Sequence, residues 1–251
     1  MMPINNFNNT KIKIFSTNKG IKIVDSPIKI QILNMLDGQV SEADIVSQTG
    51  KSKSTISVHL KNLIDEGIIS FKSHPIDRRS KLFYIFADYI GEIYPDKIIY
   101  KSPDIESDLM NQEQLYTELF RQYKSILLVH GLQLEPLEVE TGKKIGKEIY
   151  QSFEFETFDE LLDLILVKFE ELNLGRIKIS SDKPLILKNN HCHECKKLQY
   201  NMPICNITKG ILKGIFEEYY EKAVSVEEVE CTSKYDDCCT FLIETTDVNN
   251  S

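Results

Sequence analysis

All six cysteines of this chain fall between Cys192 and Cys239, and the first 191 residues contain none. The same short stretch holds two histidines and a Glu228-x-x-Cys231 pair. Thiolates, imidazoles and carboxylates are the groups that bind transition metals, and thiolates also carry redox chemistry. This segregation predicts at least two parts of different chemistry, with a metal site or thiol sensor in the C-terminal part.

The length of 251 residues is enough for two ordinary domains, each with its own core. No apolar run approaches the roughly 20 residues that span a bilayer, and the N-terminal sequence lacks the pattern of a secretory signal. We therefore expect a cytoplasmic protein with no membrane partner. In that reducing compartment, clustered cysteines are more often metal-bound or redox-active than joined in structural disulfides.

The net charge of −8 is unevenly distributed along the chain. Residues 1–101 carry 14 basic and 10 acidic side chains, whereas residues 102–251 carry 16 basic and 28 acidic ones. Chance scatter of surface charge can produce such a difference. It also fits a DNA-facing N-terminal unit joined to an acidic unit with another role.

The N-terminal third has the pattern of a β-hairpin followed by three short helices. Residues 11–16 and 21–24 alternate apolar and polar side chains around an Asn-Lys-Gly turn. Ser26-Pro27 and Ser41 stand where helix N-caps are expected, and Gly50 permits the tight turn between the second and third helices. This pattern predicts a helix-turn-helix.

The third helix is predicted to begin near Ser52 and to end before Gly67. Its apolar face seats the helix, and its other face carries hydroxyl and basic side chains that can reach base edges and phosphates. A second hairpin follows, with the basic sequence DRRSK (residues 77–81) at its tip. We expect DNA contacts from Ser52, Lys53, Ser54, Thr55, Ser57, Lys61, Arg78, Arg79 and Lys81.

The segment KSKSTISVHLKNLIDEGII and the DRRSK wing closely resemble the winged helix-turn-helix domain of ArsR-type regulators, over about residues 20–88. The resemblance implies a DNA-binding domain over residues 1–88. Regulators of this type bind palindromic double-stranded operators as homodimers.

Residues 89–130 are predicted to form a linker and a connecting helix. The linker contains Pro95 and Pro103 and has no clear period, whereas apolar residues between Ile105 and Val129 repeat largely at helical spacing. Such a stripe packs either against its own domain or against a second copy of the chain. The sequence leaves both arrangements open.

The remaining part, residues 131–245 with a tail at 246–251, alternates helical and strand patterns. Helices are expected over 141–153, 158–172 and about 204–221, and strands over 175–180, 185–187, 223–231 and 240–244. Gly142 and Gly146, four residues apart, allow close packing of helix backbones. We predict an α+β protein, in which a winged helix-turn-helix and a helical connector precede a domain with an antiparallel sheet.

The landmarks of this C-terminal part resemble the 4-vinyl reductase domain, over roughly residues 125–245. They are Leu174-Gly175 before a strand, Cys192-x-x-Cys195, Pro203-Ile204-Cys205, Gly210-x-x-x-Gly214, and Glu228-x-x-Cys231 followed by Cys239-Thr240-Phe241. Such domains occur in tetrapyrrole biosynthesis proteins and in sensor modules of bacterial regulators of aromatic catabolism. With the winged helix, the arrangement is similar to the redox-responsive archaeal regulators of the MsvR group, in which cysteine oxidation or reduction alters promoter binding.

Four residues at the ends of predicted elements can converge on one ion if the last two strands pair: Cys205, Glu228, Cys231 and Cys239. Sensor domains that this one resembles hold zinc with three cysteines and a glutamate in this order. The resemblance therefore implies zinc as the cofactor and these four residues as its ligands. Buried cysteines that act as small hydrophobic side chains are the alternative.

Cys192 and Cys195 form a C-x-x-C pair outside that set, with His191 before it and His193 inside it. Such a pair can close a disulfide or supply half of a zinc site, and a neighbouring imidazolium or metal lowers the pKa of a thiol. We assign a redox role to this pair. Cys238 is either a resolving thiol for it or a structural residue.

The function that follows is a DNA-binding regulator whose cysteine-rich domain senses redox state. A regulator that senses a small apolar effector in the same domain is the alternative, and an enzyme of tetrapyrrole or hydrocarbon metabolism is a more remote one. The sequence has no glycine-rich nucleotide loop and no Ser/His/Asp set. We therefore expect no catalytic residues and no enzymatic activity.

Overall fold

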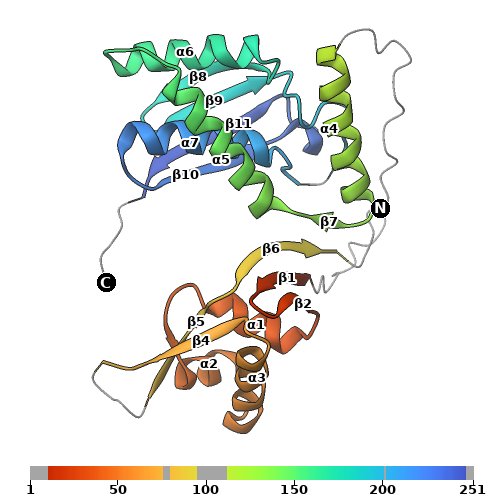
Figure 1. Cartoon of the computed structure of the whole chain (residues 1–251), viewed down its shortest axis with the longest axis vertical. Helices are drawn as coiled ribbons and strands as arrows, with labels where there is room; N and C mark the ends of the chain where they lie inside the picture. Colours follow the sequence, from red (N-terminus) through yellow and green to blue (C-terminus); the bar gives the residue numbers. More distant parts are fainter. Residues whose placement is uncertain (1–10, 76–79, 95–111, 201, 247–251) are drawn as a thin grey trace, which may run out of the picture. The chain divides into compact units, whose positions relative to one another are not determined.

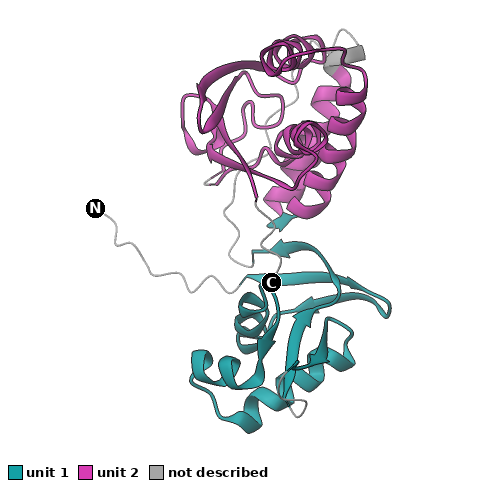
Figure 2. Ribbon diagram, turned by 90° about the vertical axis from the view of Figure 1, so that its left-hand side faces the viewer, with its two compact units in different colours: residues 1–97, 131–134 teal, residues 98–130, 135–251 magenta. Residues whose placement is uncertain are grey.

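A computed structural model describes residues 11–75, 80–94, 112–200 and 202–246. Its chain divides into two compact units (Figure 1 and Figure 2). The first comprises residues 1–97 with 131–134, and the second comprises residues 98–130 with 135–251. None of the helices in the described ranges is long and apolar enough to cross a membrane.

The N-terminal unit contains three helices and two small antiparallel sheets. The helices are α1 (Pro27–Met35), α2 (Glu42–Thr49) and α3 (Lys53–Asp65). One sheet has the order β2-β1-β6-β7, from β1 (Ile12–Thr17), β2 (Gly20–Val24), β6 (Asp88–Ile93) and β7 (Leu132–Gln133). The other has the order β3-β5-β4, from β3 (Val40–Ser41), β4 (Ile69–Ser73) and β5 (Lys81–Ile85).

Local capping explains where the helices of this unit begin. The Ser41 and Ser52 hydroxyls each accept a hydrogen bond from the backbone N–H three residues later, at 3.2 Å, and so start α2 and α3. Ser26 precedes α1 without a side-chain cap bond. Ile56 of α3 is fully buried in the core that this helix shares with α1 and α2. The expected hairpin, three helices and second hairpin are all present.

The boundary between the two units differs from the one expected at residue 88. Strand β6 lies within the expected linker and pairs antiparallel with β1 over Ile12–Ser16, and β7 adds to its other edge. These pairings are not local in sequence, so the pattern around residues 88–93 gave no sign of them. Pro95 and Pro103 lie outside the described residues. The connecting helix α4 spans Gln112–Val129 and belongs to the second unit.

The second unit is an α+β domain with a four-stranded antiparallel sheet of order β10-β11-β9-β8. Helices α5 and α7 lie against one face of the sheet (Figure 1). After α4 come α5 (Glu135–Gln151), α6 (Phe158–Glu171), β8 (Arg176–Asp182), β9 (Leu185–Asn190), α7 (Asn206–Tyr220), β10 (Val224–Glu230), a short 3-10 turn (Thr232–Lys234) and β11 (Cys239–Thr245). The fold class predicted from the sequence is confirmed.

Helices α5 and α7 cross backbone to backbone through two pairs of glycines. A Cβ atom on Gly142 or Gly146 would lie 2.2 Å from a carbonyl oxygen of α7. A Cβ atom on Gly210 or Gly214 would lie 2.2 or 2.3 Å from a carbonyl oxygen of α5. Only glycine permits this approach, and it holds the start of α7 at a fixed position beside the sheet.

Candidate functional site

Five of the six cysteines gather at one end of the C-terminal core, where several elements begin or end. Cys192 and Cys195 lie in the loop after β9, and Cys205 immediately precedes α7. Cys231 directly follows β10, and Cys239 is the first residue of β11. Antiparallel pairing of β10 with β11 brings the last two together. All five side chains are buried.

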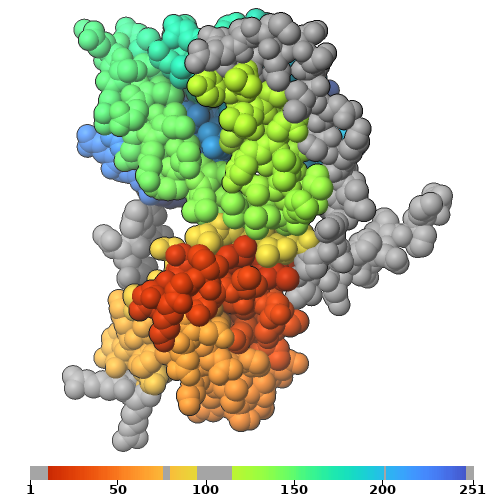
Figure 3. All heavy atoms as spheres, turned by 45° about the vertical axis from the view of Figure 1, so that its right-hand side comes forward, coloured from red at the N-terminus to blue at the C-terminus, as the bar shows by residue number. Residues whose placement is uncertain are grey.

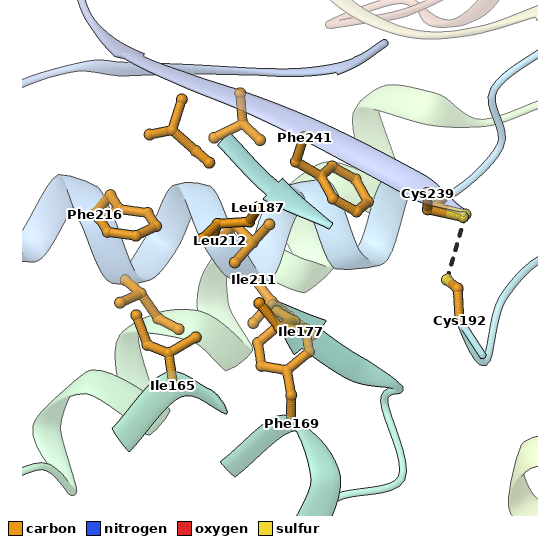
Figure 4. Close-up of a cluster of buried hydrophobic side chains, with 14 of the residues drawn as sticks. Ile165, Phe169, Ile177, Leu187, Cys192, Ile211, Leu212, Phe216, Cys239 and Phe241 are labelled. Carbon is orange, nitrogen blue, oxygen red and sulfur yellow. Dashed lines mark hydrogen bonds between the residues drawn. The ribbon is translucent and has the colours of Figure 1, made fainter. Parts of the chain in front are cut away.

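The sulfur atoms of these cysteines are in contact with one another. Cys205 Sγ lies 3.4 Å from Cys192 Sγ and 3.7 Å from both Cys231 Sγ and Cys239 Sγ. Cys239 Sγ lies 3.2 Å from Cys195 Sγ and 3.9 Å from Cys231 Sγ. Figure 4 shows the side chains of Cys192 and Cys239 pointing toward one another at the edge of the apolar core.

Two overlapping groups of four donors are suited to hold a metal ion. The first is the predicted set of Cys205, Glu228, Cys231 and Cys239, and the second contains Cys192, Cys195, Cys205 and Cys239. Within each group the donor atoms lie within 4.8 Å of one another. The expectation that the C-x-x-C pair stands apart from the zinc set therefore needs correction, because its sulfurs touch two members of that set.

Glu228 carries a buried carboxylate that the protein satisfies only in part. Its Oε2 accepts a hydrogen bond from the backbone N–H of Cys205 at 2.9 Å. Its Oε1 is buried and has no hydrogen-bond partner among the described residues. Burial, together with the nearby Cys231, raises the pKa of Glu228 to about 10. A cation beside Oε1 would supply the missing partner and keep the carboxylate ionised.

The thiols are unequal in their tendency to ionise. Hydrogen bonds from Cys195 and Cys205 hold the pKa of Cys192 well below its usual value, whereas burial raises the pKa of Cys205 well above it. Five thiolates this close together would repel one another strongly in a buried site. A bound divalent cation is the ordinary means by which proteins stabilise such a set.

Cys238 lies outside both groups of donors. It is buried, and its sulfur lies 3.6 Å from the Thr240 hydroxyl. The structure places it next to Cys239 in sequence but not among the contacting sulfurs of the described residues. Its assignment as a resolving thiol stays a prediction.

Helix α4 is attached to the loop between Cys192 and Cys195 by a buried ion pair. Lys124 Nζ donates a hydrogen bond to Glu194 Oε2 at 2.8 Å and also contacts Glu138 Oε2 at 3.2 Å. Glu194 in turn accepts the backbone N–H groups of Ile207 and Thr208, in the first turn of α7, at 3.1 and 2.6 Å. Lys124 and Glu194 are 2% and 0% exposed, so this is an interior connection.

Electrostatics keep both partners of this pair charged. Burial by itself would lower the pKa of Lys124, but the carboxylates of Glu194 and Glu138 outweigh it and raise that pKa. Burial by itself would raise the pKa of Glu194, and Lys124 outweighs it in the same way. A second contact joins the same elements, because the Phe120 ring of α4 lies 6.0 Å from the ring of His193.

The sequence analysis missed Lys124 and Glu194. The available signals were an acidic residue between two cysteines and a lysine within an otherwise apolar helical stripe. Neither signal identifies the other partner, because the two residues stand 70 positions apart.

The predicted DNA-reading residues occupy the N-terminal half of α3. Lys53, Ser54, Ser57 and Lys61 are exposed, as is the capping residue Ser52, and Thr55 is half-buried. The hydroxyls of Ser54 and Thr55 lie 2.9 and 2.8 Å from that of Ser52, and Ser57 donates a hydrogen bond to the Glu42 carboxylate of α2. The two lysines therefore have the freest side chains of the predicted surface.

The wing is the hairpin of β4 and β5. Lys81, at the start of β5, is exposed and holds its ammonium group 3.9 Å from the centre of the Phe71 ring. Lys72 lies in the same way over Tyr84, at 5.4 Å. Arg78 and Arg79 lie outside the described residues.

Comparison with known proteins gives a family for each unit. Residues 26–70 match the family described as bacterial regulatory protein, arsR family, and residues 185–245 match the 4-vinyl reductase domain family. An uncharacterized protein of Methanocaldococcus jannaschii is 33% identical over 123 residues, which are 49% of this chain and 66% of the relative. The chain thus spans just under two thirds of that relative's length.

Two further similarities fall in the same families. The arsenical resistance operon repressor of Staphylococcus xylosus is 26% identical over 73 residues, 29% of this chain and 70% of the repressor. The crystal structure of a vinyl-4-reductase family protein from Methanocaldococcus jannaschii superposes with a TM-score of 0.36 at 21% identity, over 57% of this chain and all of that chain. The chain combines an ArsR-family helix-turn-helix domain with a C-terminal 4-vinyl reductase domain, an architecture that supports a DNA-binding regulator with a sensory domain.

Proposed function

We propose that this chain is a homodimeric transcription regulator that binds a double-stranded DNA operator and responds to the redox state of its cysteine cluster. The observation that carries this proposal is the contact of five buried sulfurs with one another in the unit joined to an ArsR-family domain. The lysines of α3 and the wing, Lys53, Lys61 and Lys81, are exposed and suited to phosphate contacts, and Ser54 and Thr55 are suited to base contacts.

Zinc is the cofactor that best fits the donor set. Three thiolates and a carboxylate are ordinary ligands of tetrahedral Zn²⁺, and the unpartnered oxygen of Glu228 belongs to this set. In this assignment Cys205, Glu228, Cys231 and Cys239 hold the ion, which would contribute to the stability of the sensor domain.

Oxidation is proposed to act first on Cys192 and Cys195. A peroxide would remove two electrons and two protons from the pair, so that one disulfide forms and the peroxide is reduced to water. Glu194 lies between these cysteines and is bonded to Lys124 of α4, so a change in the loop alters the site where α4 is attached. Helix α4 is the first described element after residue 94, which makes it a suitable transmitter.

DNA affinity in two redox states tests this function. The probe is a duplex selected from a random library by the reduced protein, and the measurement is fluorescence anisotropy after dithiothreitol or hydrogen peroxide. We expect affinities that differ about 5- to 150-fold, the range of a coupling of roughly 1–3 kcal/mol. K53A/K61A should lose binding in both states, because both exposed cations of α3 are removed.

The cysteine variants locate the switch. C192S/C195S should abolish the redox response, whereas C238S, whose sulfur stands outside both donor groups, is the matched control and should keep it. A full response in C192S/C195S would move the switch to the remaining thiols. No response in the wild type would instead favour a small apolar effector, and turnover of a tetrapyrrole would favour an enzyme.

A hollow in the second unit gives the effector alternative little support. It is lined by Phe153, Phe155 and the three carboxylates of Glu154, Glu156 and Glu160. Burial of a small apolar ligand against three carboxylates would cost desolvation energy. The cysteine cluster is therefore the better sensor.

A further inference from the structure

The six donor atoms of the cysteine cluster form two tetrads, and the tetrads share two members. Cys205 and Cys239 belong to both, Cys192 and Cys195 to one, and Glu228 and Cys231 to the other. One tetrahedral ion would use four donors and leave two buried donors without an ion. Two tetrahedral ions need eight ligand positions, and six donors fill them when two thiolates each bind both ions.

The distances between sulfurs agree with this count. A tetrahedral site with metal–sulfur bonds of about 2.3 Å has ligand atoms about 3.8 Å apart. In the all-sulfur tetrad, Cys205 lies 3.4 Å from Cys192 and Cys239 lies 3.2 Å from Cys195. In the other tetrad the three sulfurs lie 3.7–3.9 Å apart. The shared edge between Cys205 and Cys239 is 3.7 Å.

Hydroxyl groups distinguish terminal from shared sulfurs. Thr232 Oγ1 lies 2.8 Å from Cys195 Sγ, and Ser233 Oγ lies 3.0 Å from Cys231 Sγ. The closest hydroxyl contact recorded for a shared sulfur is much longer, 3.9 Å between Thr232 Oγ1 and Cys239 Sγ. A thiolate bound to one ion keeps lone pairs for a hydrogen bond, whereas a thiolate that bridges two ions has fewer to give.

We propose that the cluster is a dinuclear site for two divalent, thiolate-preferring cations such as Zn²⁺, bridged by the thiolates of Cys205 and Cys239. Cys192 and Cys195 complete the first ion, and Glu228 and Cys231 complete the second. This inference rests on the proposed function, because it adds an ion to the zinc site assigned there.

The charges near the cluster are suited to two ions. Five thiolates and one carboxylate carry six negative charges and two divalent cations carry four positive ones, which leaves about −2. Lys124 is close enough to Cys205 for an electrostatic interaction, and Cys205 also stands at the N-terminal end of the α7 dipole. The C-x-x-C pair would then be both a ligand pair and the redox target, so its oxidation would release a metal ion.

Metal stoichiometry of the full-length reduced protein tests the proposal. After saturation with Zn²⁺ and desalting, native mass spectrometry should give two ions per chain for the wild type and for the control C238S. C192S/C195S should retain one ion, and E228Q/C231S should also retain one. Far-UV circular dichroism of each variant reports whether it is folded.

Cadmium substitution tests the bridge without any variant. The wild type loaded with ¹¹³Cd²⁺ should give two NMR resonances, one for an all-sulfur site and one for a site with an oxygen ligand. Bridging thiolates should produce scalar coupling between the two ¹¹³Cd nuclei. Two uncoupled resonances would overturn the shared-thiolate assignment.

The outcomes separate this proposal from the zinc site of the proposed function. One ion in the wild type that persists in C192S/C195S would overturn the dinuclear site and leave the single zinc site standing. One ion that is lost in C192S/C195S and kept in E228Q/C231S would overturn both assignments, because the ion would then occupy the four-cysteine tetrad. A wild type with no bound ion would also overturn both.

Discussion

Two buried glutamates in the C-terminal unit show how the partner of a side chain decides its role. Glu194 has a lysine and two backbone N–H donors, so it is a satisfied anion. Glu228 has one backbone donor and an oxygen without a partner in the described part of the chain. The first glutamate joins structural elements, whereas the second is suited to a metal ion.

Removal of the lysine at position 124 should therefore destabilise the second unit. K124M would leave Glu194 buried without its counter-ion, and such a change costs about 3–5 kcal/mol. K124M/E194Q should recover part of this loss, because the amide oxygen still accepts an N–H group and no charge is left unpaired. Urea unfolding followed by circular dichroism measures both. A loss below about 1 kcal/mol for K124M would contradict an interior ion pair.

At the scale of elements, the α5–α7 crossing is the contact that fixes the cysteine cluster. Helix α7 begins directly after Cys205, so its position sets the place of a shared ligand. Close approach of the two helices depends on glycine at four sites, and salt bridges such as Lys143–Glu217 (2.6 Å) flank the crossing.

Alanine at Gly146 should weaken this crossing. Its Cβ atom would meet the Ile211 carbonyl oxygen at 2.2 Å, so the helices must separate. Overpacking of this kind typically costs about 1–3 kcal/mol, and the shift of α7 should also lower metal affinity. K144A, on an exposed position of the same helix, is the matched control and should change stability by less than about 0.5 kcal/mol. Chemical denaturation gives the stability and competition with a chelator gives the affinity; wild-type values for G146A would show that the crossing has room.

The sequence predicts elements whose signals are local and misses contacts that are not. Ser41 and Ser52 cap helices from within one turn, so α2 and α3 were predicted nearly to the residue. The four zinc ligands could be grouped because they stand at the ends of strands that pair. The pairing of β6 with β1 could not be predicted, since it joins segments about 75 residues apart. The contact between the C-x-x-C loop and the shared cysteines depends on the path of that loop through space.

At the scale of the whole molecule, a regulator of a palindromic operator needs two copies of the chain, and α4 offers a surface for their contact. Leu119 and Tyr123 on this helix are 63% and 57% exposed, and Leu115, Tyr116 and Ile126 are at least half exposed. Figure 3 shows α4 at the surface of the molecule. Its other face carries Lys124 and Phe120 toward the cysteine loop. One helix would therefore connect the sensor to the dimer interface.

Charge placed on the exposed face of α4 should separate the two copies. L119E/Y123E would bring four carboxylates into an apolar interface of a symmetric dimer, and burial of unpaired charge costs several kcal/mol. We expect the wild type to sediment as a dimer at micromolar concentration and the variant as a monomer with at least tenfold weaker operator binding. V167E is the matched control, since Val167 is 55% exposed on α6, and it should remain dimeric. A variant that stays dimeric would place the interface elsewhere, and a wild type that is monomeric with full operator affinity would remove the need for one.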